Sequence, residues 1–286
     1  MTGRPVRLEH AHRLELIGDG EADASLTQDL TLEVSLPYGY DPAGPAYPVV
    51  YLLDGHWYFP IISQALRLIG MDRRVRPVIV AGLRYRRTGR SEPWEEERIL
   101  ALRCRDLTPF AERRDAWLHA AGSPRGPGIE HAGAERFLCF IEQVVKPAIQ
   151  QAFRVDPADA TLAGFSLGGL CTLYSLFEHP GRFKRYVAGS PALWWGEAAL
   201  LERALVAERA EMCGERRLFL FVGGREEEGS LQPFGMLSHL ERLTQILRER
   251  PVAGLRWSSA VLEGDDHSTA AAVGLIKGLV SVLDSR

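Results

Sequence analysis

A serine set among small residues is the part of this sequence best suited to chemistry. Residues 164–169 read Gly-Phe-Ser-Leu-Gly-Gly and match the pattern G-x-S-x-G, with Ser166 at its centre. The motif lies between a short predicted strand, 161–163, and a predicted helix, 167–177. Small residues permit a tight strand-to-helix turn that lifts the serine hydroxyl above a sheet. Because a helix N-terminus favours developing negative charge, this context predicts a nucleophile and not merely a capping serine.

A serine nucleophile needs a general base, and three histidines follow it in the chain. His179 lies at a predicted helix end, where capping is the simpler role, and His239 lies inside a predicted helix. His267 follows a strand predicted at 255–262 and lies on a loop at its carboxyl end. From there an imidazole can reach Ser166. The sequence therefore predicts His267 as the base.

The base in turn needs an acid that orients it, and the usual chain order places that acid between the serine and the histidine. Three consecutive glutamates, 226–228, follow a strand predicted at 218–222. One of them should accept a hydrogen bond from His267. Glu226 is favoured, with Glu227 as the alternative.

Acyl transfer also needs backbone donors for an oxyanion. The N–H of Leu167, directly after the nucleophile, is one candidate. The second is expected in the loop after an early strand, here residues 52–57, where Gly55 allows close backbone approach. The N–H of His56 is the predicted second donor. A helix is predicted after this loop, from about 60 to 70.

The elements that must position these residues follow an α/β pattern. Two alternating segments, 6–17 and 26–36, predict antiparallel strands at a sheet edge. Continuously apolar runs at 48–53 and 77–83 are typical of parallel strands buried on both faces. Strands and helices then alternate to the end of the chain. The pattern predicts an α/β fold in one domain, 1–286, with a mostly parallel central sheet and helices on both faces.

Residues 84–131 form a different kind of segment, which we predict to be an irregular Arg-rich insertion. Only three of the 34 basic residues are lysine, and 12 of the 31 arginines fall between 73 and 114. One interpretation is that they pair with nearby glutamates on the surface. The other is an Arg-lined mouth for an anionic substrate.

The overall composition restricts the partners. Lys+Arg 34 against Asp+Glu 37 gives a net charge of -3, which argues against nucleic-acid binding. No secretory signal and no apolar run long enough to span a membrane is visible, so a cytoplasmic location is expected. The four cysteines are widely spaced and predict no metal site, and no motif predicts a cofactor. The oligomeric state stays open.

With these residues identified, the sequence resembles the putative esterase family of α/β-hydrolases, the esterase D-like group. Five ordered segments carry the resemblance: 47–55, 105–109 (Arg-Asp-Leu-Thr-Pro), 164–169, 190–195 (Ser-Pro-Ala-Leu-Trp-Trp) and 264–267 (Gly-Asp-Asp-His). Within the family the sequence is most similar to siderophore esterases of the IroE and Fes type. The resemblance implies hydrolysis of a bulky acyl-serine or catecholate ester.

The expected activity is therefore that of a serine esterase, working through an acyl-enzyme on a small-molecule ester. Candidate substrate-binding residues are Trp57, Trp194 and Trp195, for which core packing is the alternative role, and Arg105. Two other functions are compatible with the same residues. One is an acyltransferase that passes the acyl group to an alcohol, and the other is a catalytically silent binding protein.

Overall fold

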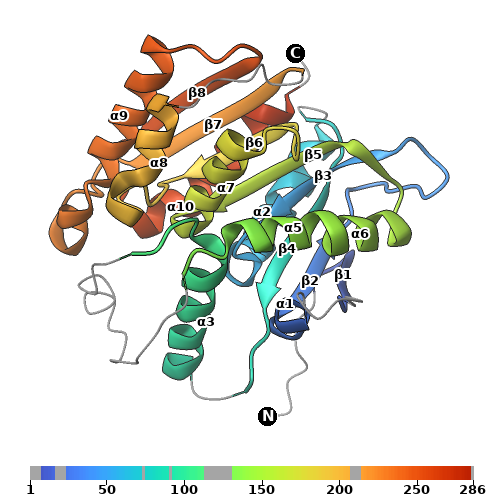
Figure 1. Cartoon of the computed structure of the whole chain (residues 1–286). Coiled ribbons are helices and arrows are strands. Elements are labelled where there is room, and N and C mark those ends of the chain that lie inside the picture. The colour runs from blue at the N-terminus through green and yellow to red at the C-terminus, as the bar shows by residue number, and fades with distance from the viewer. Residues whose placement is uncertain are drawn as a thin grey trace.

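One eight-stranded sheet runs through the computed structural model, which describes residues 8–16, 24–72, 75–89, 92–112, 131–206 and 214–284 (Figure 1). The strand order is β1-β2-β4-β3-β5-β6-β7-β8. β1 and β2 are antiparallel to their neighbours, and the strands from β4 to β8 are parallel. The strands are β1 (Ala11–Leu14), β2 (Leu30–Ser35), β3 (Tyr47–Leu52), β4 (Ile79–Tyr85), β5 (Val155–Phe165), β6 (Arg185–Gly189), β7 (Arg216–Gly223) and β8 (Leu255–Leu262).

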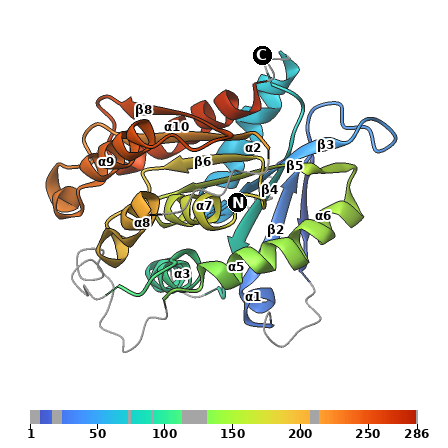
Figure 2. The same ribbon diagram turned by 45° about the horizontal axis from the view of Figure 1, so that its top comes forward.

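Helices cover both faces of the sheet, as the alternating pattern predicts. The helices are α1 (Ala24–Asp29), α2 (Gly55–Met71), α3 (Glu92–Leu107), α5 (Ala134–Phe140), α6 (Lys146–Ala152), α7 (Leu167–Glu178), α8 (Trp195–Val206), α9 (Met236–Glu249) and α10 (His267–Leu283). One apolar core lies under α3, α5, α7, α8 and α9, and a second lies under α2 and α10. Figure 2 shows α3 and α5 on one side of the sheet and α2 on the other. None of the helices in the described ranges has the length and apolar character of a membrane span.

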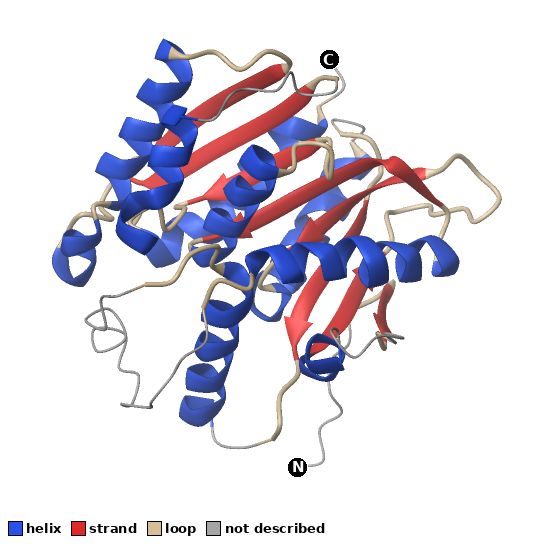
Figure 3. Cartoon of the chain, in the orientation of Figure 1, coloured by secondary structure: helices blue, strands red, loops and turns tan. Residues whose placement is uncertain are grey.

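The sequence of each strand reflects its place in the sheet. β3 is central, and its apolar residues from 48 to 52 are all buried. Strands covered on both faces have this continuous apolar character. β8 lies at an edge, and most of its side chains are at least partly exposed. Figure 3 shows the strands as one twisted sheet with the helices packed around it.

The N-terminal edge differs from the prediction in one place. The alternating pattern predicts one strand over residues 26–36, but Ala24–Asp29 is a short helix and Leu30–Ser35 is the strand. Leu26 and Leu30 are both buried and are four residues apart, a spacing that also fits a helical turn. Of the strand predicted at 6–17, the described residues contain Ala11–Leu14.

The segment predicted to be irregular contains a 16-residue helix, α3, so the prediction is wrong for Glu92–Leu107. Its buried residues recur at helical spacing: Glu95, Ile99, Arg103, Cys104, Asp106 and Leu107. Several are charged and have hydrogen-bond partners; Glu95, for example, accepts a 2.6 Å hydrogen bond from the backbone N–H of Thr88. Because polar side chains occupy the buried face, a search for apolar periodicity does not detect this helix.

Glycines allow α10 to pack closely on the sheet. A methyl group at Gly274 would overlap the ring of Phe221 on β7. We expect Gly274→Ala to reduce the free energy of unfolding by about 1–3 kcal/mol, as overpacked cores do. Gly70→Ala, on α2, is the matched control because nothing lies within 4 Å of its added methyl group. It should stabilise the helix by about 0.5–1 kcal/mol. Urea denaturation of both variants checks the pair, and equal effects would contradict this account of the packing.

Candidate active site

Ser166 occupies a strained turn between β5 and α7. Its backbone has φ 59° and ψ −116°, a conformation that non-glycine residues rarely adopt. Its N–H donates a 2.9 Å hydrogen bond to the carbonyl of Gly189 at the end of β6. Gly164 makes the turn possible, because a side chain there would overlap the backbone of Gly168. The predicted nucleophile therefore sits in the sharp strand-to-helix turn that its motif requires, and such strain is typical of functional sites.

His267 and Glu226 lie together, as predicted. The imidazole Nδ1 of His267 lies 2.7 Å from Oε2 of Glu226. The carboxylate is 1% exposed, and its other oxygen accepts a 2.8 Å hydrogen bond from the N–H of Gly223 and one from the hydroxyl of Ser190. These contacts hold Nδ1 as the donor to the carboxylate and leave Nε2 as the basic nitrogen.

The other two glutamates face elsewhere. Oε1 of Glu227 accepts a 2.6 Å hydrogen bond from the N–H of Ser238 on α9. Glu228 accepts one from Arg225 at 2.9 Å, and both of those side chains are largely exposed. Of the three candidates, Glu226 is the one in contact with the imidazole.

His267 is held at the first residue of α10. The preceding Asp266 caps this helix, and its Oδ1 accepts hydrogen bonds from the N–H groups of Ser268 and Thr269 at 2.9 and 3.0 Å. These backbone bonds lower the pKa of Asp266. The ring centroids of His267 and Phe165, the residue before Ser166, are 4.6 Å apart. The base candidate is thus placed beside the nucleophile turn.

The predicted oxyanion loop lies next to that turn. α2 begins at Gly55 and not near residue 60, so His56 belongs to its first turn, where backbone N–H groups lack partners within the helix. The helix can begin there because Asp54 adopts φ 56° and because Gly55 packs against the backbone of Gly82. Gly168 packs so closely on Asp54 that a Cβ atom added to this glycine would lie 3.0 Å from Oδ2 of Asp54. The loop therefore contacts the first turn of α7, which begins with Leu167.

A buried ion pair supports this loop. Asp54 accepts hydrogen bonds from Nε and Nη2 of Arg103 at 2.7 and 3.0 Å, and both residues are buried. Burial alone lowers the pKa of Arg103, but the charge of Asp54 outweighs it and the pKa lies above its ordinary value. The guanidinium also lies 4.9 Å from the ring of Trp57. No local pattern in the sequence predicts this pair, because its two residues are 49 positions apart.

The four candidate substrate residues have different environments. Trp57 is 37% exposed and can contact a ligand. Trp194 is 7% exposed and stacks on Phe234 with ring centroids 4.6 Å apart. Trp195 is fully buried and donates a 2.7 Å hydrogen bond to the carbonyl of Phe110, so core packing describes it better. Arg105 is bound by Asp106 and by Asp29, which suits a structural role.

Arginines of the predicted mouth are paired with carboxylates wherever the structure describes them. The pairs are Arg76–Asp159, Arg84–Glu33, Arg86–Glu15, Arg87–Glu96, Arg98–Asp29, Arg103–Asp54 and Arg105–Asp106. The remaining arginines of the group, Arg73, Arg74, Arg90, Arg113 and Arg114, lie outside the described residues. The described part of the segment thus favours ion pairing over an anion-binding mouth.

The side chain of His56 has no hydrogen-bond partner for either ring nitrogen in the described structure. Burial lowers its pKa from 6.5 to about 4. Between these two pH values the unfolded chain binds a proton that the folded chain does not. The stability conferred by the neutral imidazole is therefore complete above pH 6.5 and is lost as the pH falls toward 4.

We expect His56→Phe to remove this part of the pH dependence, which amounts to about 3 kcal/mol at most. The measurement is the free energy of unfolding of both proteins at several pH values between 4 and 7. The wild-type curve should fall more steeply with acidification than the curve of the variant. Parallel curves would show that His56 does not titrate in this way.

Comparisons with known proteins identify the family of the chain. A family model described as Putative esterase matches residues 24–121 and 106–246. Ferri-bacillibactin esterase BesA of Bacillus subtilis is 32% identical over 189 residues, which are 63% of this chain and 60% of that protein. The match thus spans less than two thirds of the length of that relative. Siderophore triacetylfusarinine C esterase of Aspergillus fumigatus is 28% identical over 277 residues, 87% of this chain and 86% of the relative.

A solved structure covers the whole chain. The crystal structure of BES protein from Bacillus cereus matches with a TM-score of 0.80 and 26% identity, over 100% of both chains. The family match, the eight-stranded sheet and this structural likeness agree with one another. The chain therefore belongs to the putative esterase family and has an α/β-hydrolase fold.

Proposed function

We propose that this protein is a serine esterase that hydrolyses carboxylic esters through an acyl-enzyme. The observation that carries the proposal is the 2.7 Å contact between His267 and the buried carboxylate of Glu226, beside the strained turn of Ser166. A carboxylate that fixes the tautomer of a histidine next to a serine is the arrangement that activates a hydroxyl. Relatives named as siderophore esterases support ester hydrolysis.

The mechanism follows from these positions. Oγ of Ser166 attacks the ester carbonyl while Nε2 of His267 takes the hydroxyl proton. The negative charge formed on the carbonyl oxygen is stabilised by the N–H groups of Leu167 and His56. The intermediate collapses, and His267 returns the proton to the leaving alcohol. Water then attacks the acyl-enzyme with the same base, which frees the acid and restores Ser166.

The proposed substrates are bulky acyl esters of the siderophore type. Two of the relatives are named for siderophores, ferri-bacillibactin and triacetylfusarinine C. Trp57 lies next to the predicted oxyanion donor His56 and is exposed, so an aromatic or apolar group of a substrate can pack on it. Any iron carried by such a ligand would belong to the substrate.

The first test measures activity and covalent labelling together. The wild-type protein should hydrolyse siderophore esters, iron-free or ferric, with a higher kcat/KM than short p-nitrophenyl or feruloyl esters. A fluorophosphonate should label it. Ser166→Ala should lose labelling and about a millionfold in kcat, because the nucleophile is absent. Labelling of the variant would reject the assignment of Ser166.

The same assay separates hydrolysis from transfer. Products are measured with and without an added alcohol. Free acid as the main product in both cases supports an esterase. A dominant new ester would instead identify an acyltransferase, and the absence of turnover and labelling would identify a binding protein.

The second test distinguishes the two neighbouring glutamates. Glu226→Gln keeps the size of the side chain, but its amide nitrogen would face Nδ1 of His267 and stabilise the wrong tautomer. We expect kcat to fall by about 10³–10⁴-fold. Glu227→Gln is the matched control and should leave kcat within about twofold, because that side chain contacts Ser238. The reverse result would place the acid at Glu227.

A further inference from the structure

β8 ends the sheet with an open edge, and none of the described strands pairs with its outer side. The carbonyl of Leu262 accepts a 2.9 Å hydrogen bond from the N–H of Gly224, next to β7. Because backbone groups along a strand alternate in direction, the even-numbered residues of β8 face β7 and the odd-numbered ones face outward. The outward residues are Trp257, Ser259 and Val261, whose backbone donors and acceptors have no partner in the part of the chain that the structure describes.

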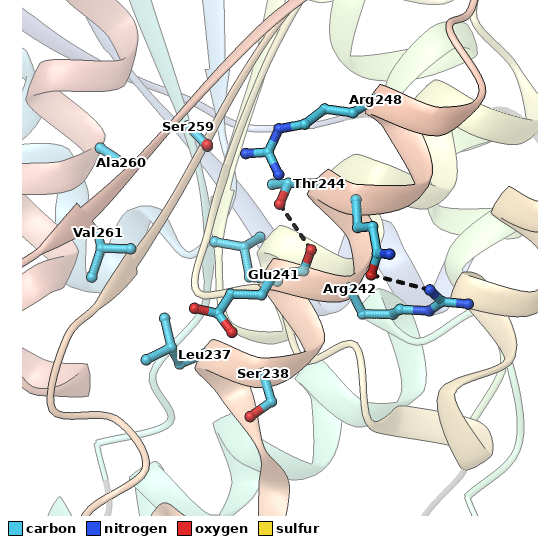
Figure 4. A pocket seen from close by; sticks show the side chains of 11 residues that line it. Leu237, Ser238, Glu241, Arg242, Thr244, Arg248, Ser259, Ala260 and Val261 are labelled. Carbon is cyan, nitrogen blue, oxygen red and sulfur yellow. Dashed lines mark hydrogen bonds between the residues drawn. The ribbon is translucent and has the colours of Figure 1, made fainter.

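A groove of about 630 Å³ runs between this edge and α9 (Figure 4). Its lining includes Leu237, Glu241 and Arg248 from the helix and Ser259 and Val261 from the strand. Val261 is 42% exposed, a high value for a large apolar side chain in a sheet. Figure 4 shows the Arg248 end of α9 near Ser259 and the Leu237 end near Val261. The helix and the strand therefore run in opposite directions along the groove.

Arg242 also lines this groove, but its side chain points away from β8 and donates a 3.2 Å hydrogen bond to Gln245 (Figure 4). The two opposite charges on the side of the strand have no ion-pair partner among the described residues. They are Glu241 and Arg248, both exposed. They are seven residues apart, about 10 Å along the helix axis. The guanidinium of Arg248 lies 5.7 Å from the ring of Trp257. Arg248 therefore lies level with the part of the outward row between Trp257 and Ser259, and Glu241 lies toward Val261 (Figure 4).

From this edge and these charges we infer that β8 is a dimerisation strand, which pairs antiparallel with β8 of a second copy of this chain. A two-fold axis at Ser259 places each Ser259 opposite its equivalent. Trp257 then lies opposite the partner's Val261, an aromatic and β-branched pair that favours strand association. Because outward backbone groups are directly opposite one another, each such pair exchanges two hydrogen bonds. The two sheets join into one of sixteen strands.

The same axis brings the charges together. Rotation exchanges the two ends of the groove, so the partner's Arg248 comes to the level of Glu241, and the reverse holds for the other copy. An isologous interface requires this self-complementarity, and a different partner protein would have no reason to match it. The strand also lacks the usual protection of an open edge. It contains no proline, and its one charged residue, Arg256, pairs with Glu215 at 3.2 Å.

Sedimentation velocity over a range of protein concentrations tests the proposal with the full chain. The wild-type protein should be a dimer that dissociates on dilution. E241R and R248E each place like charges opposite each other, and each should raise the dissociation constant by about tenfold or more. The double variant E241R/R248E restores opposite charges and should return the dissociation constant to near the wild-type value. K277E, on α10 at the other face of the sheet, makes the same change in charge as R248E and is its control.

Each possible outcome decides the proposal. A wild-type protein that stays monomeric at every concentration overturns it. A dimer that is insensitive to E241R and R248E forms through another surface, which also overturns it. Two weakened single variants without recovery in the double variant would exclude this two-fold arrangement. Circular dichroism of every variant verifies that the chain is folded, and esterase activity is not needed for any of these measurements.

Discussion

The buried carboxylate of Glu226 is the contact on which the site depends. A charge in this position is tolerated only when hydrogen bonds replace its lost water. The donors are the imidazole of His267, the N–H of Gly223 and the hydroxyl of Ser190, which come from three separate segments of the chain. Their positions depend on the carboxyl ends of β6, β7 and β8. The register of these three strands therefore determines how the proposed catalytic residues Glu226 and His267 lie relative to each other.

Three non-glycine residues near these contacts have a strained backbone. Ser166, Ser190 and Asp54 all have positive φ values, 59°, 36° and 56°. Each follows the end of a strand, where the chain must turn sharply toward the site. Such conformations persist only where surrounding contacts compensate for them. Here the compensation includes the two buried carboxylates, Glu226 with its three donors and Asp54 with Arg103.

The sequence predicts a site residue well where the pattern that identifies it lies within a few neighbouring residues. Ser166 and Leu167 are fixed by a six-residue motif, and His267 by its place after a late strand. No local pattern separates Glu226 from Glu227, because adjacent residues of a turn point in directions that composition does not encode. Ser190 appeared only inside a family segment, and its contact with Glu226 spans 36 positions.

The fold, too, is predictable where the pattern in the sequence is local. The parallel strands follow from continuous apolar runs, and the structure confirms the mostly parallel sheet. α3 was missed because Glu95, Arg103 and Asp106 on its buried face are charged. Arginine density in this region allows either surface ion pairs or a substrate mouth, whereas Arg103 forms a buried ion pair with Asp54 in the predicted oxyanion loop. A buried ion pair leaves no periodic trace in a sequence, since each partner by itself looks like a surface residue.

The two edges of the sheet are unequal, and the difference bears on the proposed chemistry. β1 has four residues, too few to serve as an extensive template for another strand, whereas β8 has eight. β8 also leads through four residues to His267, so its position sets that of the proposed base. Among the described strands, β7 is the one that pairs with β8, and it holds β8 from one side. A second copy on the open side would restrain the strand from both sides, and with it the loop that carries the imidazole. The self-association inferred for this edge therefore has a physical route to the site that does not require any residue of the partner to enter it.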